Sequence, residues 1–144
     1  QEIPADRFVE HKAAPGVTLK VIAGTVGGVT GPVTDIAVDP VYVDLRLEGG
    51  AAHRIDLPAG HQAFAYLFGG AARIGGTDVT AGHLALLDSG DHVAVTAGPE
   101  GAALVIIAGQ PIKEPIARYG PFVMNTREEI EQALDDFRGG KPAA

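Results

Sequence analysis

The sequence contains no cysteine. This absence excludes disulfide bonds, a thiolate nucleophile and a cysteine-ligated zinc site, and it fits a reducing compartment. Long hydrophobic runs are also missing, since no apolar stretch reaches the roughly 18 residues of a membrane-spanning helix, and the N-terminus shows no signal-peptide pattern. We therefore expect a cytoplasmic protein without a membrane partner.

Positive charge is scarce as well. Eleven Lys and Arg residues stand against 18 Asp and Glu residues, which gives a formal net charge of −7. Because nucleic-acid binding depends on basic side chains that neutralise phosphates, this balance disfavours nucleic acid as a direct partner. Aromatic residues make up only 6% of the chain, and tryptophan is absent.

Glycine and proline, by contrast, are abundant. The chain has 20 Gly and 10 Pro among 144 residues, together with 46% hydrophobic residues. A length of 144 residues corresponds to one domain with a real core. Frequent Gly and Pro divide the chain into short segments, which favours strands joined by tight turns over a helical bundle.

Alternating hydrophobicity predicts many strands. In 41–48 (VYVDLRLE), aliphatic residues hold every odd position and mainly polar residues every even one, which predicts a strand with one buried face. Comparable runs are 19–23, 53–57, 62–68, 71–74, 83–87, 92–96 and 102–108, with glycine-containing breaks at 69–70, 75–76, 81–82, 89–90 and 98–99. This spacing predicts an all-β barrel or jelly roll. Residues 1–16 lack any period and are interpreted as a linker or extended arm.

One helix is expected near the C-terminus. Thr126 and Glu129 have the spacing of a capping box, in which each side chain accepts a hydrogen bond from the other residue's backbone N–H. An apolar stripe at helical spacing follows, and Gly139-Gly140 provides the stop signal. The stripe comprises Ile130, Ala133, Leu134 and Phe137. Because so short a helix is marginal alone, we expect it to dock on the barrel or on a partner.

Histidines are the most reactive side chains available. His53, His61, His83 and His92 all lie in or beside predicted strands, but no two of the five histidines are two, three or four residues apart. A metal site would therefore need distant histidines to converge. The glycine-rich run 24–31 (GTVGGVTG) lacks the GK[ST] ending of a phosphate loop, and we interpret it as a flexible β-connection.

The C-terminal region carries a family resemblance. The runs 119–133 (YGPFVMNTREEIEQA) and 136–140 (DFRGG) resemble the C-terminal signature of the pirin family. The segments 21–24 (VIAG), 31–33 (GPV), 57–61 (LPAGH) and 111–115 (PIKEP) are similar to that family too. The resemblance implies a C-terminal domain over 17–140, followed by a tail over 141–144, with the fold of a cupin: a double-stranded β-helix or jelly-roll barrel with one C-terminal α-helix.

The resemblance further implies a two-cupin parent. In pirins an N-terminal cupin holds iron or a similar divalent metal, and members are described as quercetin 2,3-dioxygenases or as iron-dependent regulators that bind transcription factors. This chain resembles only the C-terminal half, and its opening resembles the segment that joins the halves. We therefore expect a fragment, or a product cut within that linker, whose metal and chemistry reside in the N-terminal half.

The cupin metal pattern can be placed on this sequence. Its two motif histidines fall on Asp56 and Pro58, its glutamate on Gln62, and its later histidine at about Val93. Since Pro58 and Val93 offer no side-chain donor and Gln62 is neutral, we expect no catalytic residue, no cofactor-binding residue and no metal in this chain. Weak metal candidates remain, and they are His61, His92 and Asp56.

Three functional hypotheses follow. The first is a metal-free cupin domain that supports the metal-bearing N-terminal half of the same protein. The second is a stand-alone barrel that binds a small molecule, lined by Phe64, Tyr66, His61 and His92. The third is an interaction module, with a homodimer or another protein as partner, whose candidate contact residues are Phe122, Met124, Ile130, Leu134 and Phe137.

Overall fold

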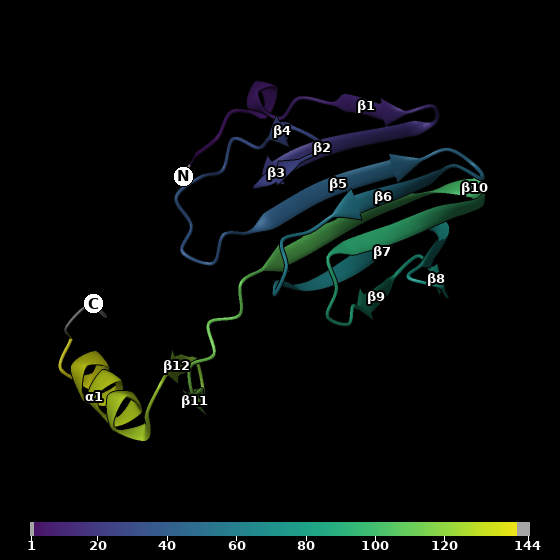
Figure 1. Cartoon of the computed structure of the whole chain (residues 1–144). Helices are drawn as coiled ribbons and strands as arrows, with labels where there is room; N and C mark the ends of the chain where they lie inside the picture. The colour runs from purple at the N-terminus through teal and green to yellow at the C-terminus, as the bar shows by residue number, and fades with distance from the viewer. Residues whose placement is uncertain (1, 141–144) are drawn as a thin grey trace. The chain divides into compact units, whose positions relative to one another are not determined.

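The computed structural model describes residues 2–140. They form two compact units, the sandwich unit up to Pro111 and the C-terminal unit from Ile112 onward. The sandwich unit is built from strands, and the C-terminal unit contains a small hairpin and the α-helix (Figure 1). This confirms the expected all-β class with one C-terminal helix. The predicted tail over 141–144 lies outside the described residues.

The sandwich unit contains a short 3-10 helix and ten strands among the described residues. In chain order they are η1 (Ala5–Arg7), β1 (His11–Ala14), β2 (Val17–Ala23), β3 (Thr25–Val26), β4 (Val29–Thr30), β5 (Val41–Leu47), β6 (Ala52–Asp56), β7 (Gln62–Ile74), β8 (Thr77–Thr80), β9 (His83–Leu86) and β10 (His92–Gly109).

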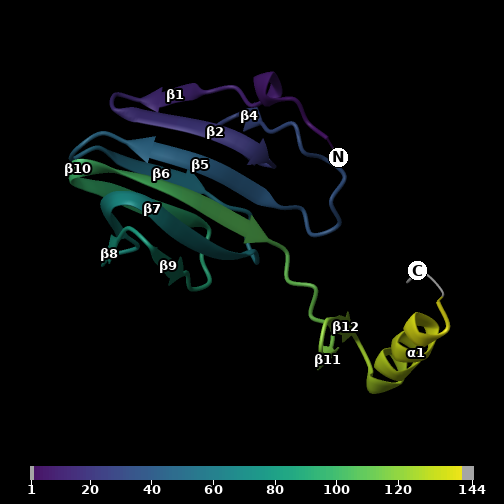
Figure 2. The same ribbon diagram turned by 180° about the vertical axis from the view of Figure 1, so that it is seen from behind.

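Two long strands, β7 and β10, run through both layers of the sandwich (Figures 1 and 2). In the first layer the order is β1-β2-β5-β10-β7-β9, because the later half of β10 pairs with β5 on one side and with the earlier half of β7 on the other. In the second layer the order is β6-β10-β7-β8, formed by the earlier half of β10 and the later half of β7. All of these pairings are antiparallel.

The long strands change layer at glycines. Gly70 in β7 has φ = +71°, and Gly101 in β10 has φ = +86°. A Cβ atom on Gly70 would collide with the carbonyl oxygen of Gly101, so these two backbones approach closely only because Gly70 lacks a side chain, and a Cβ atom on Gly101 would meet the carbonyl oxygen of Leu47. The sequence analysis interpreted 69–70 and 98–99 as breaks between separate strands. That interpretation is wrong, since the breaks are bends within continuous strands.

The core lies between the two layers. Strand β5 alternates as predicted, with its odd-numbered residues buried and its even-numbered residues half-buried or exposed. Strands β2 and β10 contribute matching buried rows. The most buried large side chains are Leu45, Ile55, Leu67, Leu104, Ile106, Val17, Val43 and Val95. Within residues 2–140 no buried residue is polar or charged, so apolar burial is what holds the two layers together.

Two segments predicted as irregular contain strands. Residues 11–14 of the expected N-terminal arm form β1, which pairs with β2 at the edge of the first layer. Part of the glycine-rich run 24–31 forms the small hairpin β3–β4, with Thr25 opposite Thr30 and their hydroxyl oxygens 2.9 Å apart. The sequence pattern misses both because each strand is too short to show a period.

The C-terminal unit consists of β11 (Ala117–Tyr119), β12 (Phe122–Met124) and α1 (Arg127–Arg138). The capping box is confirmed: the Glu129 backbone N–H donates to the Thr126 hydroxyl at 3.2 Å, and the Thr126 N–H donates to the Glu129 carboxylate at 2.9 Å. Helix α1 packs on the β11–β12 hairpin, an element absent from the sequence prediction. Its length is far below that of a membrane span, and no other helix within 2–140 is long and apolar enough for one.

Candidate functional site

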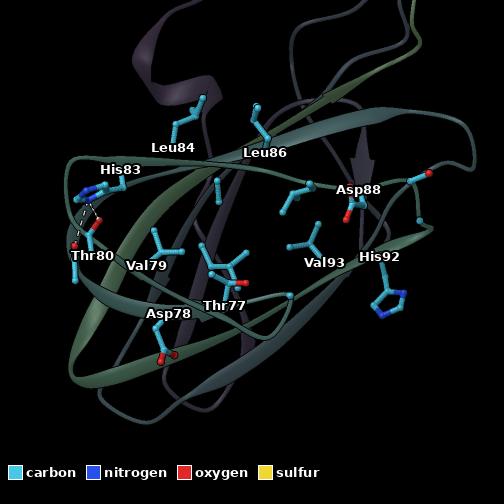
Figure 3. A pocket seen from close by; sticks show the side chains of 16 residues that line it. Thr77, Asp78, Val79, Thr80, His83, Leu84, Leu86, Asp88, His92 and Val93 are labelled. Carbon is cyan, nitrogen blue, oxygen red and sulfur yellow. Dashed lines mark hydrogen bonds between the residues drawn. The ribbon is translucent and has the colours of Figure 1, made fainter.

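A cavity of the sandwich unit opens between β8 and β9, the edge strands of the two layers, and has a volume of about 610 Å³ (Figure 3). Its inner wall is apolar and includes Ile74, Val79 and Val93, all of which are buried. The lining also includes the polar residues Asp78 and His83. A pocket of this size with an apolar wall and a few polar groups is typical of a small-molecule site.

His83 is fixed at one end of this cavity. Its Nδ1 donates to the carbonyl oxygen of Thr80 at 3.1 Å and lies 3.2 Å from the Thr80 hydroxyl (Figure 3). Since a carbonyl oxygen only accepts, Nδ1 carries the proton in this contact. The ring is therefore oriented by the β8–β9 turn.

His92 is directed away from the centre of the cavity (Figure 3). Its Nδ1 donates to the Asp91 carboxylate at 2.6 Å. This hydrogen bond, together with the positive charge of the protonated ring, lowers the pKa of the Asp91 carboxyl from its ordinary value of 3.8. The pair lies at the surface, with side-chain exposures of 42% for His92 and 73% for Asp91.

Asp56 faces His92 across the β6–β10 ladder, since the two residues are register partners. Both lie on the outer face of the second layer, because their neighbours Ile55 and Val93 point into the core. The Asp56 side chain is 79% exposed and accepts a 2.8 Å bond from Nε of Arg54. Its carboxylate thus belongs to a surface ion pair.

His61 has a different environment. It follows β6 in a tight turn, and its side chain is only 7% exposed. Its Nε2 lies 2.8 Å from the carbonyl oxygen of Asp39, so the ring donates there and ties two loops together. This contact is what holds the ring, and neither Asp56 nor His92 shares in it.

Asp56 and His92 are therefore neighbours on the outer face, but His61 does not join them. In the part of the chain that the structure describes, no group of three or more His, Asp or Glu side chains is placed to hold a metal ion. Val93, at the position of the later cupin histidine, is 4% exposed and packs in the core. The described residues of this chain do not fit the iron that the resemblance implies for the family.

The predicted ligand-lining role of Phe64 and Tyr66 is wrong. Their neighbours Ala65 and Leu67 are fully buried, so both aromatic rings lie on the outer face of the first layer. Sequence reasoning missed this because 63–68 is apolar on both faces, which leaves alternation unable to say which face is inside.

An apolar surface on that outer face is the functional feature that the sequence analysis did not find. Phe64 pairs with Leu86, and Tyr66 pairs with Leu84, across the β7–β9 ladder. Leu86 is 81% exposed, and Leu84 is 53% exposed. We call this surface the outer apolar face, and it consists of Phe64, Tyr66, Phe68, Leu84 and Leu86.

The predicted interaction residues all lie in the C-terminal unit. Ile130 is buried and, with Leu134, lines a cavity of about 430 Å³ between the helix and the hairpin. Phe122 and Phe137 meet edge to face with ring centroids 5.9 Å apart, and Met124 is half-buried. Several large apolar side chains of this unit remain exposed, namely Ile112, Ile116, Tyr119, Val123 and Phe137.

A bent two-layer sandwich whose two longest strands pass through both layers is a cupin, and solved cupins match it. A quercetin 2,3-dioxygenase from Acinetobacter baumannii superposes with a TM-score of 0.87 at 32% identity, covering 97% of this chain and 49% of that one. The family described as the pirin C-terminal cupin domain matches residues 42–143. The chain belongs to this family.

Curated relatives agree. Human pirin is 38% identical over 98% of this chain and 50% of its own length. A pirin-like protein of Caulobacter vibrioides is 37% identical over 98% of this chain and 51% of its own length. The chain thus spans about half the length of the curated relatives that it matches.

Proposed function

We propose that this chain acts as the metal-free C-terminal half of a two-cupin pirin protein and that its task is to support a metal-bearing N-terminal cupin. The observation that carries the proposal is the outer apolar face. Solvent-facing positions of an antiparallel sheet are normally polar, whereas here two aromatic and two leucine side chains pair across β7 and β9.

Burial of the outer apolar face by a partner protein is energetically favourable. Burying one leucine or phenylalanine side chain contributes about 1.5–3 kcal/mol, so a partner that covers several of them gains a substantial binding free energy. Strand β5, which is separated from β7 by β10, presents polar groups outward, and its Arg46 stacks over the Phe68 ring at 5.6 Å. An apolar centre beside a polar rim is the usual anatomy of a protein interface.

The C-terminal unit supplies a second reason. Fewer than about 40 residues seldom fold stably alone without a disulfide, a metal or a partner, and this unit begins only at Ile112. It leaves Ile116 and Phe137 largely exposed. We infer that this apolar surface also contacts the N-terminal half.

On this proposal, any oxygenase activity of the whole protein belongs to the N-terminal half. The Acinetobacter structure is that of a quercetin 2,3-dioxygenase, and this chain corresponds to about half of it. The residues at the cupin ligand positions here provide no metal-binding set. This chain's contribution is then to shape and stabilise the catalytic half.

The test is a chimera in which this chain replaces the C-terminal half of the Acinetobacter enzyme. With Fe(II), quercetin and oxygen, the isolated chain should show no turnover, and the chimera should be active. Leu86→Glu should lower chimera activity at least tenfold, because it places a charge in the interface. Thr96→Glu, also exposed but on the outer face of the second layer, is the matched control. Turnover by the isolated chain would overturn the proposal.

The cavity between β8 and β9 favours a second candidate, a stand-alone small-molecule-binding cupin. Ala85 lies on the inner face of β9 and lines this cavity, so Ala85→Phe should fill it. Calorimetric binding of quercetin to the isolated chain, lost in Ala85→Phe and retained in Thr96→Glu, which lies outside the cavity, would support this candidate. Equal binding by both variants would count against it.

A further inference from the structure

A second cavity opens on the opposite side of the sandwich, between β1 of the first layer and β6 of the second. It has a volume of about 330 Å³, and the β3–β4 hairpin contributes to its wall. Leu19 and Val26 line it as buried apolar residues, and Val29 is half-buried. The remaining lining residues include His11 and His53, with Lys12, Arg54 and Asp56 at the exposed rim.

Strand register aims two histidines into this space. His11 on β1 is the partner of Leu19, which points into the core. His53 on β6 is the partner of Val95, which also points into the core. Because directly opposed residues of an antiparallel pair lie on the same face, both imidazoles are directed inward, one from each layer. Both are half-buried and line the cavity.

These two imidazoles differ from the other three in the chain. His61, His83 and His92 each have a hydrogen-bond partner that fixes the ring. Over residues 2–140, no hydrogen bond or ion pair engages the ring of His11 or His53. A half-buried ring nitrogen without a protein partner is available to a ligand.

The charge around this cavity is opposite in sign to the net charge of the whole chain. The chain carries a formal net charge of −7, yet two cations, Lys12 and Arg54, line the exposed rim of this cavity, each next to one of the two inward histidines. Asp56 is the one acidic residue among the described lining residues, and Arg54 already binds it at 2.8 Å. Lys12 forms no ion pair with any described residue. The local excess of positive charge selects an anion.

We propose that this cavity binds a small organic carboxylate. The carboxylate accepts hydrogen bonds from the imidazoles of His11 and His53, and the positive charge of Lys12, at the exposed rim of the cavity, attracts it. The body of the ligand rests against Leu19 and Val26. Charge-assisted bonds of this kind are among the stronger hydrogen bonds, and the apolar wall favours an organic acid over inorganic phosphate. The inference concerns the sandwich unit alone and does not rest on the proposed supporting role.

Benzoate and inorganic phosphate serve as probes with the whole chain, in calorimetry and in proton NMR of the imidazole ring signals. Benzoate should shift the ring signals of His11 and His53 and leave those of His83 and His92 in place. His53→Gln and Lys12→Gln should each weaken benzoate binding about tenfold. His92→Gln and Lys113→Gln, which remove the same groups outside the cavity, should leave it unchanged.

The outcomes separate cleanly. Phosphate that binds as tightly as benzoate and is lost in the same variants would overturn the assignment to an organic carboxylate in favour of a general anion site. Equal shifts at all five histidines, or unchanged binding in folded Lys12→Gln and His53→Gln, would overturn the site altogether. Thermal unfolding of each variant shows whether it is folded, and His53→Asn provides a second variant if His53→Gln unfolds.

Discussion

Single residues without a side chain decide where the sheet folds over itself. Gly70 and Gly101 sit where β7 and β10 pass from one layer to the other, both with positive φ. A side chain at either position would meet the backbone of a neighbouring strand, Gly101 on the Gly70 side and Leu47 on the Gly101 side. Two requirements therefore coincide at one bend, a left-handed backbone conformation and a close approach of chains.

The first prediction separates these two requirements. Gly70→Ala should destabilise the sandwich by more than about 3 kcal/mol, because the new methyl group forces two strands apart in addition to straining φ. Gly50→Ala is the matched control, since Gly50 has φ = +75° but open space around it. It should cost only about 1–2 kcal/mol. Urea unfolding of both variants measures the difference, and equal losses would show that the close approach contributes nothing.

Polar residues show the same dependence on position. Asp56, His61 and His92 share the chemistry of metal ligands, but each is held by a different neighbour and two of them lie on the outer face. The residue types therefore suggested a metal site, but the three side chains do not point toward a common centre. The pair Asp91 and His92 is instead a surface ion pair with a lowered Asp91 pKa.

At the scale of elements, helix α1 is the element that the local sequence predicts most completely. Its capping box, apolar stripe and stop signal are all confirmed over Arg127–Arg138, with Gly139 as the C-cap. These signals act within one turn or a few residues, so a linear reading recovers them. The hairpin on which α1 packs was missed, because β11 and β12 have three residues each.

The second prediction concerns this helix. Thr126→Ala removes the hydroxyl that accepts the Glu129 N–H, so the helix should lose about 1 kcal/mol of stability. Faster hydrogen exchange at the backbone amides of the first turn should report this loss. Thr96→Ala, at an exposed strand position, is the control and should leave those amides unchanged. Unaltered exchange in Thr126→Ala would show that packing on the hairpin alone holds the first turn.

Some strands were predicted from the sequence more accurately than others. Strand β5 was predicted closely, because its alternation is strict and one face is polar. Strands β7 and β10 were each divided in two, because a glycine pair is equally compatible with a turn and with a bend. Only the long-range pairing of β10 with β5, β6 and β7 distinguishes these cases.

At the scale of the whole molecule, the main hydrophobic core lies within the sandwich unit. The core cluster extends from Val17 to Ala108, and none of its members belongs to the C-terminal unit. The outer apolar face and the exposed apolar side chains of the C-terminal unit are the surfaces that remain to be covered. Together they support the proposal of a half that works with a second cupin.

The third prediction follows from this division. A chain ending at Pro111 keeps all of β10, so it should fold and unfold cooperatively with a Tm within about 4 °C of the parent, equivalent to roughly 1 kcal/mol. Its far-ultraviolet circular dichroism should lose the helical signal. Differential scanning calorimetry provides the measurement. A truncated chain that aggregates or melts without a cooperative transition would contradict the independence of the sandwich core.

The sequence by itself determined the fold class, the strict alternation of β5, the boundaries of α1 and the membership in the pirin family, because these depend on local periodicity, capping and extended similarity. Only the tertiary structure decided which face of β7 is buried, where the long strands bend, and that His11 and His53 from opposite layers line one cavity. The physical reason is that burial and convergence arise from contacts between residues far apart in the chain, which no local pattern records.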